Sequence, residues 1–139
     1  MAQEQSTASA TVLVVDDSDL ARTEMMRLLV EDGLVAVGLA SPIGATRAIL
    51  ANAVSVVVID VLMPGMRGDR LAALFRGNPR LRELGVVLVS GDDIELHRLS
   101  AEVSADAVVS KSALHELVPA VRRALRARER LSSRPRYDD

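Results

Sequence analysis

The chain has 139 residues, a formal net charge of −2 and a composition that is 49% hydrophobic. These values predict one globular domain, and the lack of cysteine excludes a disulfide framework and a thiolate metal site. No apolar run approaches the roughly 20 residues that span a bilayer, and residues 1–9 lack the basic start and apolar stretch of a signal peptide. We therefore expect a cytoplasmic protein that does not enter a membrane.

Apolar runs of strand length recur along the chain, at residues 11–15, 34–40, 54–59, 85–89 and 107–109. Three of the runs are continuous rather than alternating, which is typical of parallel strands covered on both faces. Helical patterns lie between them, at residues 20–30, 43–51, 68–75, 93–103 and from 114 onwards. This alternation predicts a doubly wound parallel sheet with right-handed crossovers.

Prolines affect the expected start of two helices. Ser41 is predicted to cap the second helix, with Pro42 at its first position. Pro119 lies within the last helical pattern, where a proline removes a hydrogen bond and clashes with the preceding turn. We therefore expect a late start or a kink in the first turns of that helix.

The two ends of the chain lack these patterns. Residues 1–10 and 131–139 are predicted to be disordered tails, and the domain is expected to span residues 11–130. The arginine-rich stretch 122–131 gives the end of the chain a positive charge. A solvated helix end that suits the negative helix C-terminus is the simplest interpretation, so nucleic-acid binding by this chain alone is not expected.

Polar side chains occur where four of the predicted strands end. Asp16 and Asp17 follow the first strand, and Asp60 follows the third. Ser90 follows the fourth strand, and Lys111, the only lysine of the chain, follows the fifth. Because sites in such sheets lie beyond the carboxyl ends of the strands, we expect these side chains to converge.

Three carboxylates in one crevice repel one another unless a cation neutralises them. Oxygen ligands alone favour a hard, small cation, Mg²⁺ or Mn²⁺, and Mg²⁺ usually binds carboxylates together with phosphate oxygens. Lys111 would supply a positive charge and Ser90 a hydroxyl donor to a phosphoryl group. A carboxylate such as Asp60 can act as the covalent nucleophile, giving an aspartyl phosphate.

Four segments of the chain, residues 14–17, 59–68, 88–91 and 109–111, resemble the signature of response-regulator receiver domains of two-component signalling. The resemblance spans about residues 11–128 and extends to single-domain regulators such as those of chemotaxis. It implies a flavodoxin-like (βα)5 three-layer sandwich. The five parallel strands would then have the order 2-1-3-4-5.

The resemblance also implies a role for each candidate residue. Asp60 would be the phosphoacceptor, phosphorylated from a histidine kinase or a phosphotransfer protein. Ser90 and Lys111 would contact the phosphoryl group and pass its presence to a surface that binds a partner. The implied ligands of Mg²⁺ are Asp16 (through water), Asp17, Asp60 and the backbone carbonyl of Leu62.

Two positions depart from the usual pattern of this family. Ser112 stands directly after Lys111, where the family usually has a proline, often with a cis bond. A non-proline cis bond costs about 3 kcal/mol, so a cis peptide is not expected here. Val108 stands where the family usually has the rotating aromatic switch residue. We therefore expect intact phosphorylation with a non-standard relay.

Other functions need residues that differ from these. A haloacid-dehalogenase-type phosphatase needs a second carboxylate two residues after the nucleophile, where this chain has Leu62. A nucleotide-binding domain needs a glycine-rich loop after its first strand, where this chain has residues 16–19, three of them acidic. The alternative that stays open is a receiver-like interaction module that acts without phosphorylation.

The chain is predicted to be a signalling phosphoacceptor rather than an enzyme, apart from self-catalysed phosphoryl transfer and slow autodephosphorylation. The expected partners are a kinase or phosphotransfer protein, a downstream protein or a missing effector domain, and a second copy of the chain. His97 and His115 are expected to be solvated side chains on helix surfaces.

Overall fold

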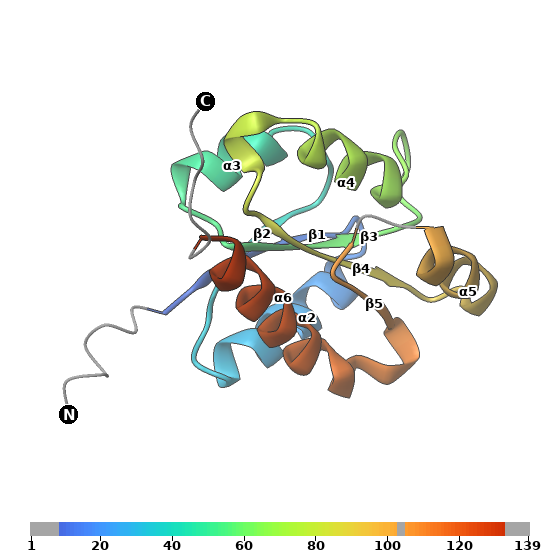
Figure 1. The fold of residues 1–139 in the computed structure, drawn as a ribbon. Helices are drawn as coiled ribbons and strands as arrows, with labels where there is room; N and C mark the ends of the chain where they lie inside the picture. The colour runs from blue at the N-terminus through green and yellow to red at the C-terminus, as the bar shows by residue number, and fades with distance from the viewer. Residues whose placement is uncertain (1–8, 103–104, 133–139) are drawn as a thin grey trace.

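The computed structural model describes residues 9–102 and 105–132, which form one parallel sheet flanked by helices (Figure 1). The strand order is β2-β1-β3-β4-β5, which confirms the predicted flavodoxin-like fold. The strands are β1 (Thr11–Val15), β2 (Val35–Leu39), β3 (Val56–Asp60), β4 (Gly85–Ser90) and β5 (Ala107–Ser110). The helices are α2 (Asp19–Glu31), α3 (Ala45–Ala51), α4 (Gly68–Arg76), α5 (Asp93–Glu102) and α6 (Leu117–Ser132). Two 3-10 segments are η1 (Pro79–Leu81) and η2 (Lys111–Glu116).

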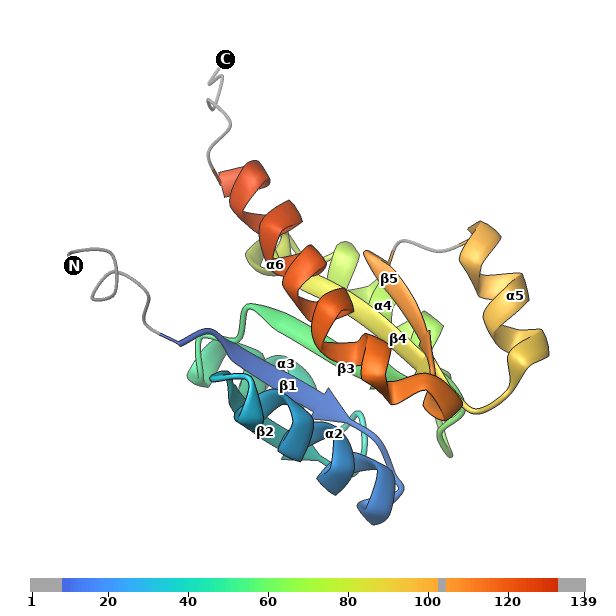
Figure 2. The same cartoon turned by 90° about the horizontal axis from the view of Figure 1, so that it is seen from below.

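The sheet separates two hydrophobic cores. Helices α3 and α4 cover one face, where Ile49 and Phe75 pack against strand residues. Helices α2 and α6 cover the other face, where Met25 and Val121 pack (Figure 2). The described residues of β1, β3 and β4 are almost all fully buried, because a parallel strand in the middle of the sheet has a helix layer on each side.

The strand order reverses beside β1, which pairs with β2 on one side and β3 on the other. Val15 is the register partner of Ile59, so the residues that follow them, Asp16 and Asp60, are brought to the same point of the sheet edge. This is the switch point at which the two halves of the fold diverge and where doubly wound sheets hold their ligands.

The predicted start of the second helix was wrong. Helix α3 begins at Ala45 rather than residue 43, and its N-cap is Gly44 with φ of 84°. The Ser41 hydroxyl accepts a hydrogen bond from the Ile43 N–H at 3.2 Å, which forms a local turn instead of a helix cap. Gly44 then reverses the chain in the left-handed region, where a residue without Cβ has no steric penalty.

The last helix starts late, which is one of the two outcomes expected for Pro119, the other being a kink. Residues of η2 come first, and α6 begins at Leu117, so the proline lies in its first turn. The N–H groups of a first turn have no partner within the helix, so the missing N–H of Pro119 costs no hydrogen bond there.

The predicted tails need two corrections. Helix α6 continues through Leu131 to Ser132, whose hydroxyl donates to Glu83 Oε1 at 2.7 Å, so these residues are not a tail. At the other end, the Ala10 carbonyl accepts the Val35 N–H at 2.9 Å and thus belongs to the sheet edge. Residues 1–8 and 133–139, and Val103 of the predicted fourth helix, lie outside the described residues.

Within the described part of the chain, none of the helices combines the length and the apolar character that a membrane crossing requires.

We predict that Gly68→Ala destabilises the protein. A Cβ at this position would lie 2.2 Å from the Asp60 carbonyl oxygen and 2.8 Å from its carbon, so the backbone must shift. Overpacking of this kind costs about 1–3 kcal/mol or more of unfolding free energy, which urea denaturation measures. Gly77→Ala is the matched control, because it lies at the other end of α4 with its nearest atoms 3.7 Å away. A loss at Gly68 no larger than at Gly77 would contradict the prediction.

Candidate functional site

Asp16 directly follows β1 and is held by the backbone around it. Its N–H donates to the Leu39 carbonyl at 3.1 Å, and its Oδ1 accepts the Ser18 N–H at 2.9 Å. Its carbonyl accepts Nη1 of Arg22 at 2.8 Å. The Ser18 hydroxyl in turn accepts the Ala21 N–H and caps α2. The chain therefore turns sharply at Asp16 and leaves the neighbouring Asp17 exposed at the edge of the sheet.

Asp60 is the last residue of β3 and is buried, with 4% of its surface exposed. The loop that follows is tied down at both ends. The Val61 N–H donates to the Val89 carbonyl at 2.9 Å, and the Gly68 N–H donates to the Val61 carbonyl at 2.8 Å. Gly68 packs so closely against the Asp60 carbonyl that no side chain would fit there. The backbone on both sides of the Asp60 side chain is thus immobilised by neighbouring elements.

Ser90 and Lys111 come from the two strands beyond β3. Ser90 ends β4, pairs with Ser110 of β5 and is fully buried. Its Oγ accepts the Asp92 N–H at 3.1 Å. Lys111 is the first residue after β5, and its side chain is 23% exposed. The ammonium therefore reaches back from the sheet end toward the carboxylates.

The predicted acidic residues do converge. One carboxylate oxygen from each of Asp16, Asp17 and Asp60 lies within 4.8 Å of the other two. The Lys111 ammonium lies 2.7 Å from Asp16 Oδ2 and 3.3 Å from Asp60 Oδ1. We call these four residues the acidic site. They are brought together because strands β1, β3 and β5 all end at the same edge.

Electrostatics at the acidic site are unbalanced, with three carboxylates against one ammonium. Burial and, after it, the charge of Asp16 raise the pKa of Asp60 to about 6, and Lys111 opposes this only in part. Burial by itself would lower the pKa of Lys111, but its close ion pairs with Asp16, and then Asp60, raise this pKa above its usual range. The ammonium is therefore charged at neutral pH, while Asp60 is held close to its protonation point.

The donor set of the acidic site fits a hard divalent cation. All of its candidate ligand atoms are carboxylate oxygens. Among the described contacts of Asp16, Oδ2 has no hydrogen-bond donor of good geometry, only the ion pair with Lys111. A small cation held by one or two carboxylates would balance this charge, and such chemistry is typical of Mg²⁺.

Three other predicted residues lie outside the acidic site. Leu62 has 45% of its surface exposed, and Val108 of β5 is half-buried. Ser112 is exposed, and its N–H donates to Ser110 Oγ at 3.1 Å, which caps η2. The peptide bonds of the described residues are trans, including the one between Lys111 and Ser112. His97 and His115 are both exposed, as expected.

Two further residues that support the site, Arg22 and Gly68, were not among those predicted from the sequence. Arg22 supports the Asp16 carbonyl, and its signal in the sequence is only an arginine in the first turn after an acidic loop. Gly68 carried a stronger signal, because a glycine that opens a helix without a cap suggests a close backbone approach.

Comparisons with known proteins agree with this geometry. The family model described as the response regulator receiver domain matches residues 12–122. The response regulator GacA of Pseudomonas protegens is 36% identical over 115 residues, which cover 80% of this chain and 53% of GacA. This chain therefore spans about half the length of the curated relatives it matches.

Solved structures share the whole fold. The signal receiver domain of a histidine kinase from Syntrophus aciditrophicus has a TM-score of 0.76 and 27% identity, covering 94% of this chain and 100% of that one. The response regulator TrrA of Thermotoga maritima, solved in complex with Mg²⁺ and a beryllium fluoride, has a TM-score of 0.73 and 26% identity. That alignment covers 84% of this chain and 99% of TrrA.

We predict that Asp60→Asn stabilises the metal-free protein at neutral pH. Because the pKa of Asp60 rises from 3.8 to about 6 on folding, the folded state binds more protons than the unfolded state between these values. Stability is then lost as the pH rises through this window, and the variant avoids a cost of about 1–3 kcal/mol at about pH 7.5.

Urea unfolding in a chelator, repeated at about pH 4, measures this effect. The gain should shrink to a small fraction at the lower pH, where Asp60 is protonated in the folded state and close to half protonated in the unfolded state. Asp93→Asn is the control, because Asp93 is an exposed carboxylate in the first turn of α5. A gain that persists undiminished at low pH, or an equal gain for Asp93→Asn, would contradict the assignment.

Proposed function

Since this chain belongs to the response regulator receiver domain family, we propose that Asp60 accepts a phosphoryl group from a phosphohistidine and thereby switches the binding of a partner. The observation that carries this proposal is the acidic site, in which three carboxylates meet within 4.8 Å beside one lysine. The domain we propose spans residues 10–132, which includes Ala10 at the sheet edge and the two helical residues beyond the predicted boundary.

The metal that we propose is Mg²⁺, held by Asp17 and Asp60 of the acidic site. The family resemblance adds the carbonyl of Leu62 as a further proposed ligand, with Asp16 acting through water. When bound, it would neutralise the carboxylates and the charge of the phosphoryl oxygens. The carboxylate oxygens within 4.8 Å of one another support this assignment. The complex of TrrA with Mg²⁺ and beryllium fluoride is a property of that protein and the precedent for this proposal.

Asp60 acts as the nucleophile in the proposed transfer. One of its carboxylate oxygens forms a bond to phosphorus, the phosphorus–nitrogen bond of the phosphohistidine breaks, and the electron pair of that bond leaves with the imidazole. The transfer needs Asp60 in its charged form. Because the pKa of Asp60 is about 6, this is the majority form at a pH above that value. Positioning and charge neutralisation supply the rest of the catalysis.

Lys111 and Ser90 would hold the phosphoryl group. The ammonium lies 3.3 Å from Asp60 Oδ1, so a phosphoryl group on that carboxylate lies within its reach. Ser90 Oγ accepts the Asp92 N–H, and its own O–H hydrogen can be donated to a phosphoryl oxygen. Both side chains come from strands that neighbour β3 or β4, so the sheet itself aligns them.

The partners we propose are a histidine kinase or phosphotransfer protein as donor, and a downstream protein or effector domain as target. The relatives named GacA are about twice as long as the matched segment, which supports an effector domain as one such target. A second copy of the chain is a further proposed partner. Val108 and Ser112 replace the usual relay residues, so we propose a readout that does not depend on a rotating aromatic side chain.

We predict that the wild-type chain gains one phosphoryl group when it is incubated with Mg²⁺ and a small acyl phosphate. Intact-mass spectrometry measures the adduct, and Asp60→Asn should show none because the nucleophile is missing. A chelator should also abolish the adduct. No adduct on the wild type would favour an interaction module that acts without phosphorylation. An undiminished adduct on Asp60→Asn would mean that the acceptor is a residue other than Asp60.

We also predict that Lys111→Met lowers the phosphorylation rate by about 10²-fold, since the variant lacks the ammonium that lies 3.3 Å from the reacting carboxylate. Lys111→Arg keeps the charge and should retain part of the rate. The rate is taken from adduct mass against time at saturating Mg²⁺. Equal rates for wild type and Lys111→Met would refute the role proposed for the ammonium.

A further inference from the structure

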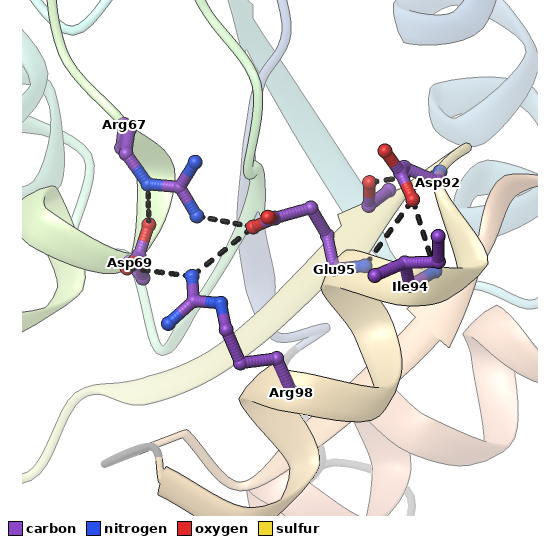
Figure 3. A network of polar contacts seen from close by, with 7 residues as sticks. Arg67, Asp69, Asp92, Ile94, Glu95 and Arg98 are labelled. Carbon is purple, nitrogen blue, oxygen red and sulfur yellow. Dashed lines mark hydrogen bonds and ion pairs between the residues drawn. The ribbon is translucent and has the colours of Figure 1, made fainter.

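An ion-pair cluster joins the start of α4 to α5 (Figure 3). Nε of Arg67 lies 3.0 Å from Asp69 Oδ1, and its Nη2 donates to Glu95 Oε1. Arg98 Nη2 lies 3.1 Å from the same Glu95 oxygen and 3.9 Å from Asp69 Oδ2. We call Arg67, Asp69, Glu95 and Arg98 the α4–α5 cluster. Two arginines face two carboxylates, so its net charge is zero.

The α4 side of the cluster is fixed relative to Asp60. Arg67 is the N-cap residue of α4, at the end of the loop that begins after Asp60. Its neighbour Gly68 donates its N–H to the Val61 carbonyl and packs against the Asp60 carbonyl. A movement of the Arg67 backbone is therefore a movement of the loop that carries Leu62.

The α5 side is fixed relative to Ser90. The Asp92 N–H donates to Ser90 Oγ at 3.1 Å. Asp92 Oδ1 then accepts the N–H groups of Ile94 and Glu95, at 2.9 and 3.2 Å, and caps α5. Figure 3 shows the hydrogen bonds that Asp92 accepts from Ile94 and Glu95. The first turn of α5 thus rests on the hydroxyl that the proposed function assigns to the phosphoryl group.

Helix α5 buries little apolar side-chain surface over residues 93–99. Of its side chains at positions 93–99, only Leu99 is buried, and Ile94 is 81% exposed. The hydrogen bond from Arg67 lowers the pKa of Glu95, so that the carboxylate stays charged at neutral pH. Because apolar burial is small, the polar contacts of the cluster carry a large share of the docking of this helix.

We propose that Arg67 and Glu95 are positioning residues, whose ion pair couples the docking of α5 to the occupancy of the acidic site. The inference rests on the proposed function of Asp60. A phosphoryl oxygen draws the Ser90 hydroxyl toward Asp60, since such a hydrogen bond is charge-assisted, and the Asp92 N–H that rests on it must move. The cluster makes the loop after Asp60 and helix α5 respond together. By reciprocity, weakening the cluster weakens the response of the acidic site.

The α4–α5 cluster offers a route for the signal that needs no aromatic side chain on β5. Val108 is half-buried and has no polar group with which to sense the phosphoryl site. In our proposal the α4–α5 cluster responds to the phosphoryl group instead, through the loops that lead into α4 and α5. Its members were not singled out from the sequence because Arg67 and Glu95 are 28 residues apart.

The test uses the full chain with Arg67→Met, Glu95→Gln and the double variant R67M/E95Q. Glu95→Gln removes the charge and keeps the side-chain length, and Arg67→Met removes the guanidinium but keeps an unbranched side chain. Glu24→Gln and Arg27→Met form the matched control, because they break an ion pair of 2.6 Å on the exposed face of α2. Amide hydrogen exchange of α5 is measured with chelator and with Mg²⁺ plus beryllofluoride, and the phosphorylation rate is measured by intact mass.

Each single variant should speed exchange in α5 about threefold to fivefold without beryllofluoride. Beryllofluoride should change α5 exchange in the wild type, and this change should shrink in the variants. The phosphorylation rate should fall about fivefold, because the Ser90 hydroxyl and the loop after Asp60 are then held less well in place for the transfer. In the double variant the two effects should fall clearly short of their product, because both single changes remove the Arg67–Glu95 contact. The α2 control should leave α5 exchange and the rate as in the wild type.

Two failures are distinguishable. A wild type that takes up no phosphoryl group overturns the proposed function and this inference together. A wild type that is phosphorylated, with α5 exchange and rates equal in the cluster variants and the α2 control, overturns this inference alone. The inference is also overturned if the effects of Arg67→Met and Glu95→Gln multiply in the double variant, since independent effects exclude a shared contact.

Discussion

The confinement of Asp16, Asp17 and Asp60 beside one ammonium is the interaction on which the rest of this structure depends. Charges so close together and partly desolvated repel one another, and Lys111 offsets only part of the repulsion. The fold holds them because each belongs to a strand end whose backbone is fixed by neighbours, with Asp16 tied to Leu39 and the loop after Asp60 tied to Val89. An apolar core on both faces supplies the stability that the acidic site reduces.

The same confinement explains how a phosphoryl group on Asp60 would affect helix α5. Asp60 and Ser90 end neighbouring strands, so whatever binds between them acts on two loops at once. One loop leads into α4 and the other into α5, and the α4–α5 cluster joins the two helices. Since α5 buries little apolar surface over residues 93–99, it is docked less firmly than α2 and α6, which are anchored by buried stripes.

Much of the fold follows from local patterns. The continuous valine-rich runs predicted β1, β3 and β4 within two residues of their observed ends, because only strands buried on both faces tolerate such runs. The errors lie where several local solutions have similar free energies. Ser41 can cap a helix or form a turn. The turn is favoured here because Gly44 adopts a left-handed conformation just before α3. The end of α6 was underestimated because the contact between Ser132 and Glu83 links residues far apart in the chain.

The sequence by itself determined the residue types at the strand ends and, through the alternation of strands and helices, that Asp16, Asp17, Asp60, Ser90 and Lys111 lie at one edge. Parallel strands allow no other arrangement of their carboxyl ends. Only the tertiary structure decided the distances within that edge, the pKa of Asp60, the close approach of Gly68 and the pairing of Arg67 with Glu95. These depend on burial and on contacts between residues distant in the chain, and no local pattern encodes them.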